Sequence, residues 1–233
     1  MKNQSFVTEF VFLGLSQNPN VQKLILIVSL FVYIATISGN MTIVVTIVCS
    51  PTLLGSPMYF FLAFLSLLDA SFSSAMTPKM IVDCIYERKT ISFEGCMIQL
   101  FFEHFFGGAE VIVLTAMAYD RYVAICKPLH YSSIMTRRLC GILVAVAWAG
   151  GFLHSIIQII FTLQLPFCGP NVIDHFICDL YPLLELACID THIFGLLVAA
   201  NIFVFTAMAY GQHVAIFKPL NSSSIMNRGL CYG

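Results

Sequence analysis

Long apolar stretches, separated by short polar segments, dominate the pattern along this 233-residue chain. A helix needs about 20 mainly apolar residues to cross the roughly 30 Å hydrocarbon layer of a bilayer. These stretches are apolar on every face, whereas a helix of a soluble bundle keeps one polar face. We therefore predict five membrane-spanning helices, at residues 24–48, 58–82, 97–125, 140–163 and 193–217.

The spans predict an all-α membrane protein, a helical transmembrane bundle over residues 24–217. Residues 1–23 are expected to form an N-terminal segment and residues 218–233 a tail. The first 22 residues are too polar to contain the apolar core of a cleavable signal peptide. We therefore expect the first span to act as a signal anchor.

Composition supports a bilayer environment and excludes several function classes. The chain is 59% hydrophobic and 10% charged, against roughly 25% charged residues in soluble domains. Its net charge of -1 and lack of a basic run give no sign of a nucleic-acid partner. The histidines are scattered and no nucleophile-and-base set stands out, so we expect no enzyme.

Charge alone does not orient the chain in the membrane. Placing the N-terminus outside leaves six Lys and Arg residues in the cytosol and five outside, which is no positive-inside signal. However, Asn3-Gln4-Ser5 is a glycosylation sequon that functions only in the lumen. Residues 164–192 contain three cysteines and no Lys or Arg, which suits an oxidising exterior. Both features predict an extracellular N-terminus and a cytoplasmic tail.

The C-terminal region contains an internal repeat. Residues 206–233 match residues 115–142 at 18 of 28 positions, including Lys-Pro-Leu and Ser-Ser-Ile-Met. Residues 206–233 are therefore interpreted as a degenerate copy, in which Asp120-Arg121-Tyr122 has become Gly211-Gln212-His213.

Two motifs carry a family resemblance. Residues 57–62 read PMYFFL and are followed by Asp69, and residues 117–126 read MAYDRYVAIC. Gly39-Asn40 and Trp148 add matches in the first and fourth spans. Over residues 1 to about 205, the chain resembles the olfactory (odorant) receptors, which are rhodopsin-like, class A G-protein-coupled receptors.

The resemblance implies a plasma-membrane, multi-pass receptor that binds a small volatile odorant and signals through a stimulatory, olfactory-type heterotrimeric G protein. The sixth and seventh helices of the family have no counterpart in the sequence, so the chain looks truncated after the fifth. The alternative is therefore a pseudogene-like membrane fragment with no autonomous signalling, retained in the endoplasmic reticulum or paired with other receptors in a hetero-oligomer. A transporter is a third hypothesis, which the lack of inverted repeats disfavours.

At the inner end of the third span, the resemblance implies a G-protein switch at Asp120, Arg121 and Tyr122. In the family, this arginine pairs with the preceding aspartate at rest and is released to meet the G protein. The alternative is an interfacial ion pair without a signalling role, worth about 0–1 kcal/mol if exposed.

Near the middle of the membrane, Asp69 and Glu110 are carboxyl groups that are costly in lipid and should face the bundle interior. The resemblance implies a sodium-binding polar site at these two residues, completed by Asn40. Hard cations prefer such oxygen ligands. A structural hydrogen bond is the alternative. No other cofactor or metal is expected.

The outer third of the third span is expected to line the ligand pocket, as the resemblance implies, with counterparts on the fifth span. The candidate ligand-binding residues are Glu103, His104, Gly107, Gly108, Asn201 and Phe205. The alternative is that Glu103 is a structural carboxyl group paired with His104 or with the backbone.

Cysteines 96, 168, 178 and 188 permit three pairings. The resemblance implies disulfides between Cys96 and Cys178 and between Cys168 and Cys188. A zinc site that uses His175 and Cys178 is a rival interpretation, although the spacing matches no known ligand pattern.

Overall fold

The computed structural model describes residues 8–16, 18–86, 88–167 and 171–188, and the structural statements below concern these residues. Four of their helices are long and apolar enough to cross a membrane. They are α1 (Pro19–Cys49), α3 (Pro57–Ile85), α4 (Phe93–Cys126) and α6 (Arg137–Leu163). The helical fold class is thereby confirmed, and these helices overlap the first four predicted spans. The predicted span at 193–217 lies outside the described residues.

The helix boundaries follow from local capping. Asn18, Ser92 and Thr136 precede α1, α4 and α6, and each side chain accepts a hydrogen bond from a backbone N–H of the first turn. Such caps satisfy donors that the helix itself cannot pair. Pro19 and Pro57 occupy first helical positions, where the missing N–H costs nothing. The helices therefore begin a few residues before the purely apolar stretches do.

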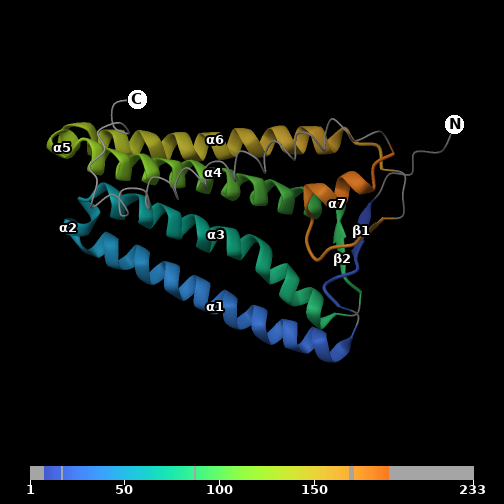
Figure 1. The fold of residues 1–233 in the computed structure, drawn as a ribbon. Helices are drawn as coiled ribbons and strands as arrows, with labels where there is room; N and C mark the ends of the chain where they lie inside the picture. The colour runs from blue at the N-terminus through green and yellow to red at the C-terminus, as the bar shows by residue number, and fades with distance from the viewer. Residues whose placement is uncertain (1–7, 17, 87, 168–170, 189–233) are drawn as a thin grey trace, which may run out of the picture.

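The long helices lie side by side in the order α1, α3, α4, α6 (Figure 1), so α4 packs between α3 and α6. Short helices connect them at one end: α2 (Pro51–Leu54) joins α1 to α3, while η1 (Pro128–His130) and α5 (Tyr131–Ile134) join α4 to α6. We call this end, which also carries Asp120, the motif end.

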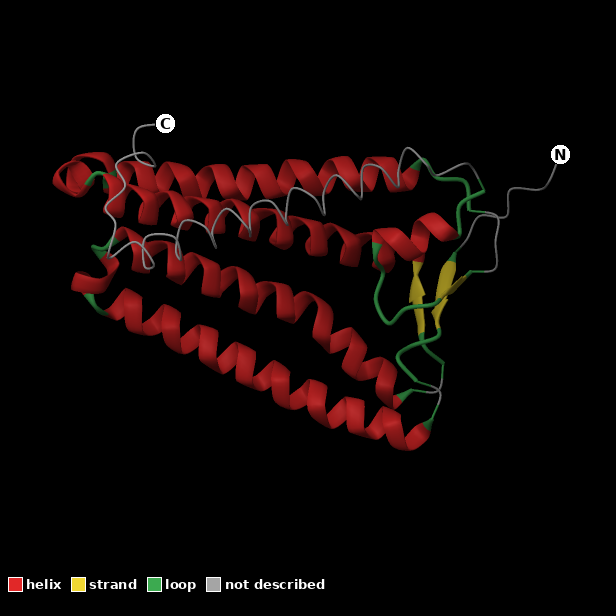
Figure 2. Ribbon diagram, in the orientation of Figure 1, coloured by secondary structure: helices red, strands yellow, loops and turns green. Residues whose placement is uncertain are grey.

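A small three-stranded sheet lies at the opposite end of the bundle, beside α7 (Leu180–Glu185), as Figure 2 shows. Strand β1 (Glu9–Phe12) is central, antiparallel to β2 (Thr90–Ser92) and parallel to β3 (Val172–Ile173). We call this end the cap end. The sequence pattern predicted no strand here, because pieces of four, three and two residues are too short to show a clear alternation.

The described residues form two buried hydrophobic clusters. At the cap end, Phe10 and Phe12 of β1 are buried with Leu100, Ile173 and Leu183 around the Cys96–Cys178 region. Along the bundle, a second cluster joins α3, α4 and α6 and includes residues such as Phe61, Val113 and Ala147. Strand β1 of the N-terminal segment is therefore part of the folded cap.

Candidate functional sites

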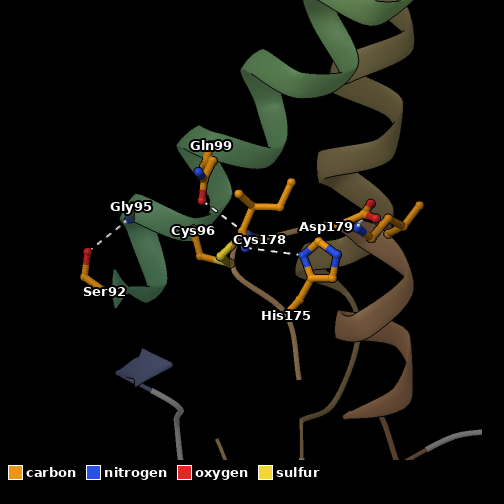
Figure 3. The surroundings of a disulfide bond; sticks show 9 residues. Ser92, Gly95, Cys96, Gln99, His175, Cys178 and Asp179 are labelled. Atoms are coloured by element: carbon orange, nitrogen blue, oxygen red, sulfur yellow. Dashed lines mark hydrogen bonds between the residues drawn. A yellow bond between two sulfur atoms is a disulfide. The ribbon is translucent and has the colours of Figure 1, made fainter. Parts of the chain in front are cut away.

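A disulfide joins the first turn of α4 to the segment before α7. Cys96 and Cys178 are 82 residues apart in sequence, and their Cα atoms are 5.4 Å apart. Beside it, the backbone N–H of Cys178 donates to Gln99 Oε1 over 3.2 Å (Figure 3). The predicted Cys96–Cys178 pair is confirmed, and the rival zinc site is excluded because Cys178 has no thiolate left to bind a metal.

The second predicted disulfide is only partly visible. Cys188 is disulfide-bonded, and Cys168 lies outside the described residues. Its pairing with Cys168 therefore stays a prediction.

Among the ligand-binding candidates, Glu103 and His104 follow one another on α4 but make different contacts. Glu103 has a buried Oε2 atom without a hydrogen-bond partner among the described residues, and the Asp179 carboxylate is close enough to interact with it electrostatically. His104 Nδ1 lies 3.0 Å from the carbonyl oxygen of Leu100, and its ring stacks on that of His154 of α6. No ion pair joins Glu103 to His104 in the described part of the chain.

The two candidate glycines also differ. A Cβ atom added to Gly108 would lie 3.2 Å from Cα of Gly151, so Gly108 marks a close crossing of α4 and α6. A Cβ atom on Gly107 would meet nothing within 4 Å. Asn201 and Phe205 lie outside the described residues, so their part in a pocket stays a prediction.

The predicted polar site is partly assembled. Asp69 on α3 and Glu110 on α4 are close enough for their carboxyl groups to interact electrostatically, and neither belongs to an ion pair in the described ranges. Carboxylate oxygens are the donors that a hard cation prefers. Asn40 instead donates its side-chain amide to the carbonyl oxygen of Thr36, within its own helix.

At the motif end, Asp120 is buried, with 2% of its surface exposed, and accepts a hydrogen bond of 2.7 Å from the Tyr131 hydroxyl. Burial, together with the nearby Asp120 carboxylate, raises the pKa of Tyr131 above its ordinary value. The hydroxyl therefore stays protonated, and the bond is kept, throughout the physiological pH range.

Arg121 follows Asp120 but does not pair with it. Its guanidinium donates to the Met58 sulfur at the start of α3, and the side chain is exposed. Tyr122 is also exposed. The structure thus differs from the expected resting pair, because the Tyr131 hydroxyl occupies the position beside Asp120 where Arg121 was expected.

Comparison with known proteins decides the family. The family model described as "Olfactory receptor" matches residues 29–210. Human olfactory receptor 4A5 is 53% identical over 236 residues, covering 98% of this chain and 73% of that protein. Human olfactory receptor 4B1 is 55% identical, covering 98% of this chain and 75% of that protein. Mouse olfactory receptor 4B13 is 58% identical, and the match covers 86% of this chain and 66% of that protein.

The chain belongs to the olfactory receptor family. It is therefore a multi-pass membrane protein of the G-protein-coupled class and not an enzyme. The two motifs that carried the resemblance, at residues 57–62 and 117–126, both lie within the matched region.

Several residues of these olfactory-receptor sites were missed by sequence reasoning. Tyr131 and Met58 contact the switch residues, while His154 and Ser155 of α6 contact His104 and the carbonyl oxygen of Phe101. The paired glycines at 107–108 and 150–151 were a usable signal of a close helix crossing. Nothing in the sequence linked Tyr131 to Asp120 in particular.

Proposed function

We propose that this olfactory receptor binds small volatile odorants at its cap end and signals through a stimulatory heterotrimeric G protein at its motif end. The observation that carries the proposal is the arrangement around Asp120, where the acid is buried against Tyr131 and Arg121 is left exposed. The family supports odorant binding, and this geometry supports a cytosolic partner.

The cap end faces outward in this proposal, and the receptor resides in the plasma membrane. Disulfides form and persist in oxidising compartments, and the Cys96–Cys178 bond lies at the cap end. The sequon at Asn3 lies on the same side of the first span. The motif end, with η1 and α5, is then cytosolic.

Arg121 suits the role of a G-protein contact because its partner in the receptor is weak. A thioether such as that of Met58 is a poor hydrogen-bond acceptor, so a partner's carbonyl or carboxylate oxygen competes readily for the guanidinium. Nearby, Leu129 is 92% exposed between Lys127 and His130. An exposed leucine beside a cation offers an apolar anchor for a protein partner. Tyr122 completes the proposed switch.

The odorant site is proposed in the cap half of the bundle, near α4. Glu103 supports this because its buried Oε2 lacks a partner in the described chain, and such a group is costly unless something pairs with it. The family-implied set is completed by His104, Gly107, Gly108, Asn201 and Phe205.

A sodium ion is proposed to be held by Asp69 of α3 and Glu110 of α4, whose carboxyl groups interact electrostatically. A bound cation would neutralise their repulsion and tie the two helices together. Asn40 joins the site only if its amide leaves the Thr36 carbonyl oxygen.

The test expresses the chain with a tag at each end and measures cAMP during exposure to an odorant panel. We expect the N-terminal tag on intact cells, a digestible glycan on Asn3 and an odorant-dependent rise in cAMP. Arg121→Ala should abolish the rise. Tyr131→Phe, which frees Asp120, should change basal cAMP by about fivefold, the worth of one hydrogen bond.

Tyr119→Phe is the matched control for Tyr131→Phe. Tyr119 is also a tyrosine at the motif end, and it is exposed and has no hydrogen bond to Asp120 in the described residues. Tags visible only after permeabilisation, an immature glycan and no cAMP response would instead support the non-signalling fragment retained in the endoplasmic reticulum.

A further inference from the structure

The side of α4 that faces α3 carries a groove that the odorant-site residues above do not line. This open groove has a volume of about 690 Å³, and small-molecule sites measure roughly 300–1,000 Å³. Its walls come from α3, β2 and the cap half of α4. The residues used below are Ser71, Ala75 and Lys79 of α3 and Gln99, Phe102 and Phe106 of α4.

One wall of the groove is apolar. Phe102 and Phe106 are four residues apart on α4 and stack on each other with ring centroids 5.7 Å apart. Ala75 on α3 belongs to the same lining. Two stacked rings and a small aliphatic side chain suit the hydrocarbon body of a small molecule.

The polar feature of the groove is the side-chain amide of Gln99. Gln99 is only 6% exposed, and its Oε1 is already used by the Cys178 N–H. Its Nε2 is buried and has no hydrogen-bond partner among the described residues. Figure 3 shows the amide oxygen turned toward Cys178, which leaves the nitrogen on the other side of the group. Gln99 therefore contributes a fixed, unsatisfied donor that is buried behind the groove wall, which a ligand must press inward to reach.

Lys79 also lines the groove but does not make it a site for an anion. Its ammonium group pairs with Asp83 one turn further along α3, and it lies 5.5 Å from the centre of the Phe12 ring. The ion pair neutralises this charge, so a carboxylate ligand would have to displace Asp83. A neutral hydrogen-bond acceptor has no such competitor at Gln99.

We propose that this groove between α3 and α4 binds small, neutral, apolar molecules that carry one carbonyl group, such as aliphatic ketones. The carbonyl oxygen accepts from Gln99 Nε2, and the hydrocarbon body lies against Phe102, Phe106 and Ala75. The inference rests on the proposed odorant-binding function and assigns it a chemical class and a second face of α4.

The groove has a competing occupant, an acyl chain of the surrounding bilayer. An acyl chain would fill the apolar wall equally well, but it carries no acceptor at the depth of Gln99. A preference for a ketone over an alkane of equal length therefore separates the proposed ligand from a lipid tail.

The experiment uses the full chain in phosphatidylcholine nanodiscs and a 2-octanone that carries a photoreactive diazirine at its far end. Crosslinked peptides are mapped by mass spectrometry while unlabelled 2-octanone or octane competes. We expect crosslinks within residues 71–79 and 95–106, on the groove side, and about fivefold stronger competition by the ketone, the worth of one hydrogen bond.

Two variants examine the polar and the apolar contact separately. Gln99→Met should abolish the preference for ketone over octane, whereas Gln158→Met, at a similarly buried glutamine of α6, should keep it. Because Gln99→Met also removes the acceptor of the Cys178 N–H, Ser71→Phe provides a second route. It fills the groove, leaves that bond intact and should reduce crosslinking several-fold.

The outcomes separate this inference from the proposed function. Competed crosslinks only at His104 and His154 would overturn the groove and leave odorant binding intact. Equal competition by octane would assign the groove to acyl chains and overturn the inference. The absence of any competed crosslink would contradict both.

Discussion

The two faces of α4 are packed in opposite ways. Toward α6, a Cβ atom on Gly151 would lie 2.5 Å from the carbonyl oxygen of Phe105 and 2.8 Å from the nitrogen of Ala109, so the two backbones nearly touch. Toward α3, Phe102 and Phe106 line a groove of about 690 Å³. One helix thus carries a closed contact on one side and an open one on the other.

The difference shows how small residues let one face of a membrane helix pack closely against its neighbour. Lipid tails are as apolar as leucine, so helices associate through close packing and hydrogen bonds, for which small residues are best suited. Aromatic side chains lie on both sides of α4, but the glycines at the α6 crossing let the backbones nearly touch there. In this receptor the α6 side is closely packed, and the α3 side has the groove in which we propose a ligand.

The largest expected effect comes from breaking the disulfide that anchors the cap over α4. Cys178→Ser should lower the stability of the purified receptor by about 2–4 kcal/mol, because the bond closes a long loop. Thermal unfolding in detergent measures this. Cys84→Ser, at a free cysteine, is the control. Equal losses in the two variants would show that the disulfide does not hold the cap.

A somewhat smaller effect on stability is expected from forcing α4 and α6 apart at their close crossing. Gly151→Leu should cost about 1–3 kcal/mol, since overpacking forces the backbones of α4 and α6 apart. Gly141→Leu is the matched control on the same helix, because a Cβ atom there would meet nothing within 4 Å. If the thermal stabilities of both variants fell together, the close crossing would not be the cause.

The smallest effect concerns one hydrogen bond across the closed face. The Ser155 hydroxyl donates to the carbonyl oxygen of Phe101 over 2.6 Å, from a fully buried position. Ser155→Ala should cost about 0.6 kcal/mol, the average for such bonds between membrane helices. Ser71→Ala removes a hydroxyl that bonds within its own helix and should leave thermal stability unchanged. A larger loss of thermal stability in Ser71→Ala than in Ser155→Ala would show that the Ser155 hydrogen bond does not stabilise the contact between α4 and α6.

Much of the fold could be predicted from the sequence because apolar length alone specifies a membrane helix. The ends of α1 and α4 extend beyond the predicted spans, since Asn18 and Ser92 cap them outside the apolar stretch. The sheet was missed because β1 is stabilised by partners distant in sequence. Its residue Phe10 is buried beside Phe93 and Phe167, which no local pattern brings together.

The candidate sites were predictable in part. The motif at residues 117–126 located Asp120 and Arg121, but their partners, Tyr131 and Met58, depend on how a connecting segment and a second helix fold back. Glu103 and His104 are adjacent in sequence and both interact electrostatically with Asp179, but the His104 ring also stacks on His154 of α6. Sequence reasoning therefore proposed a ligand region, which stays a prediction, without resolving which face of α4 is open.

The most direct measurement compares two adjacent phenylalanines of α4, which are about 100° apart around the helix. Phe102 lines the groove, whereas Phe101 packs against Phe152 of α6. Cys49, Cys84 and Cys140 are first replaced by serine, and Phe102→Cys or Phe101→Cys is then introduced in separate variants. Each variant is treated with a small membrane-permeant thiol reagent, with and without 2-octanone. The account predicts rapid labelling at position 102, slowed several-fold by the ketone, and slow labelling at position 101 that the ketone does not change. Protection at position 101 but not at position 102 would contradict it and place the ligand on the α6 side.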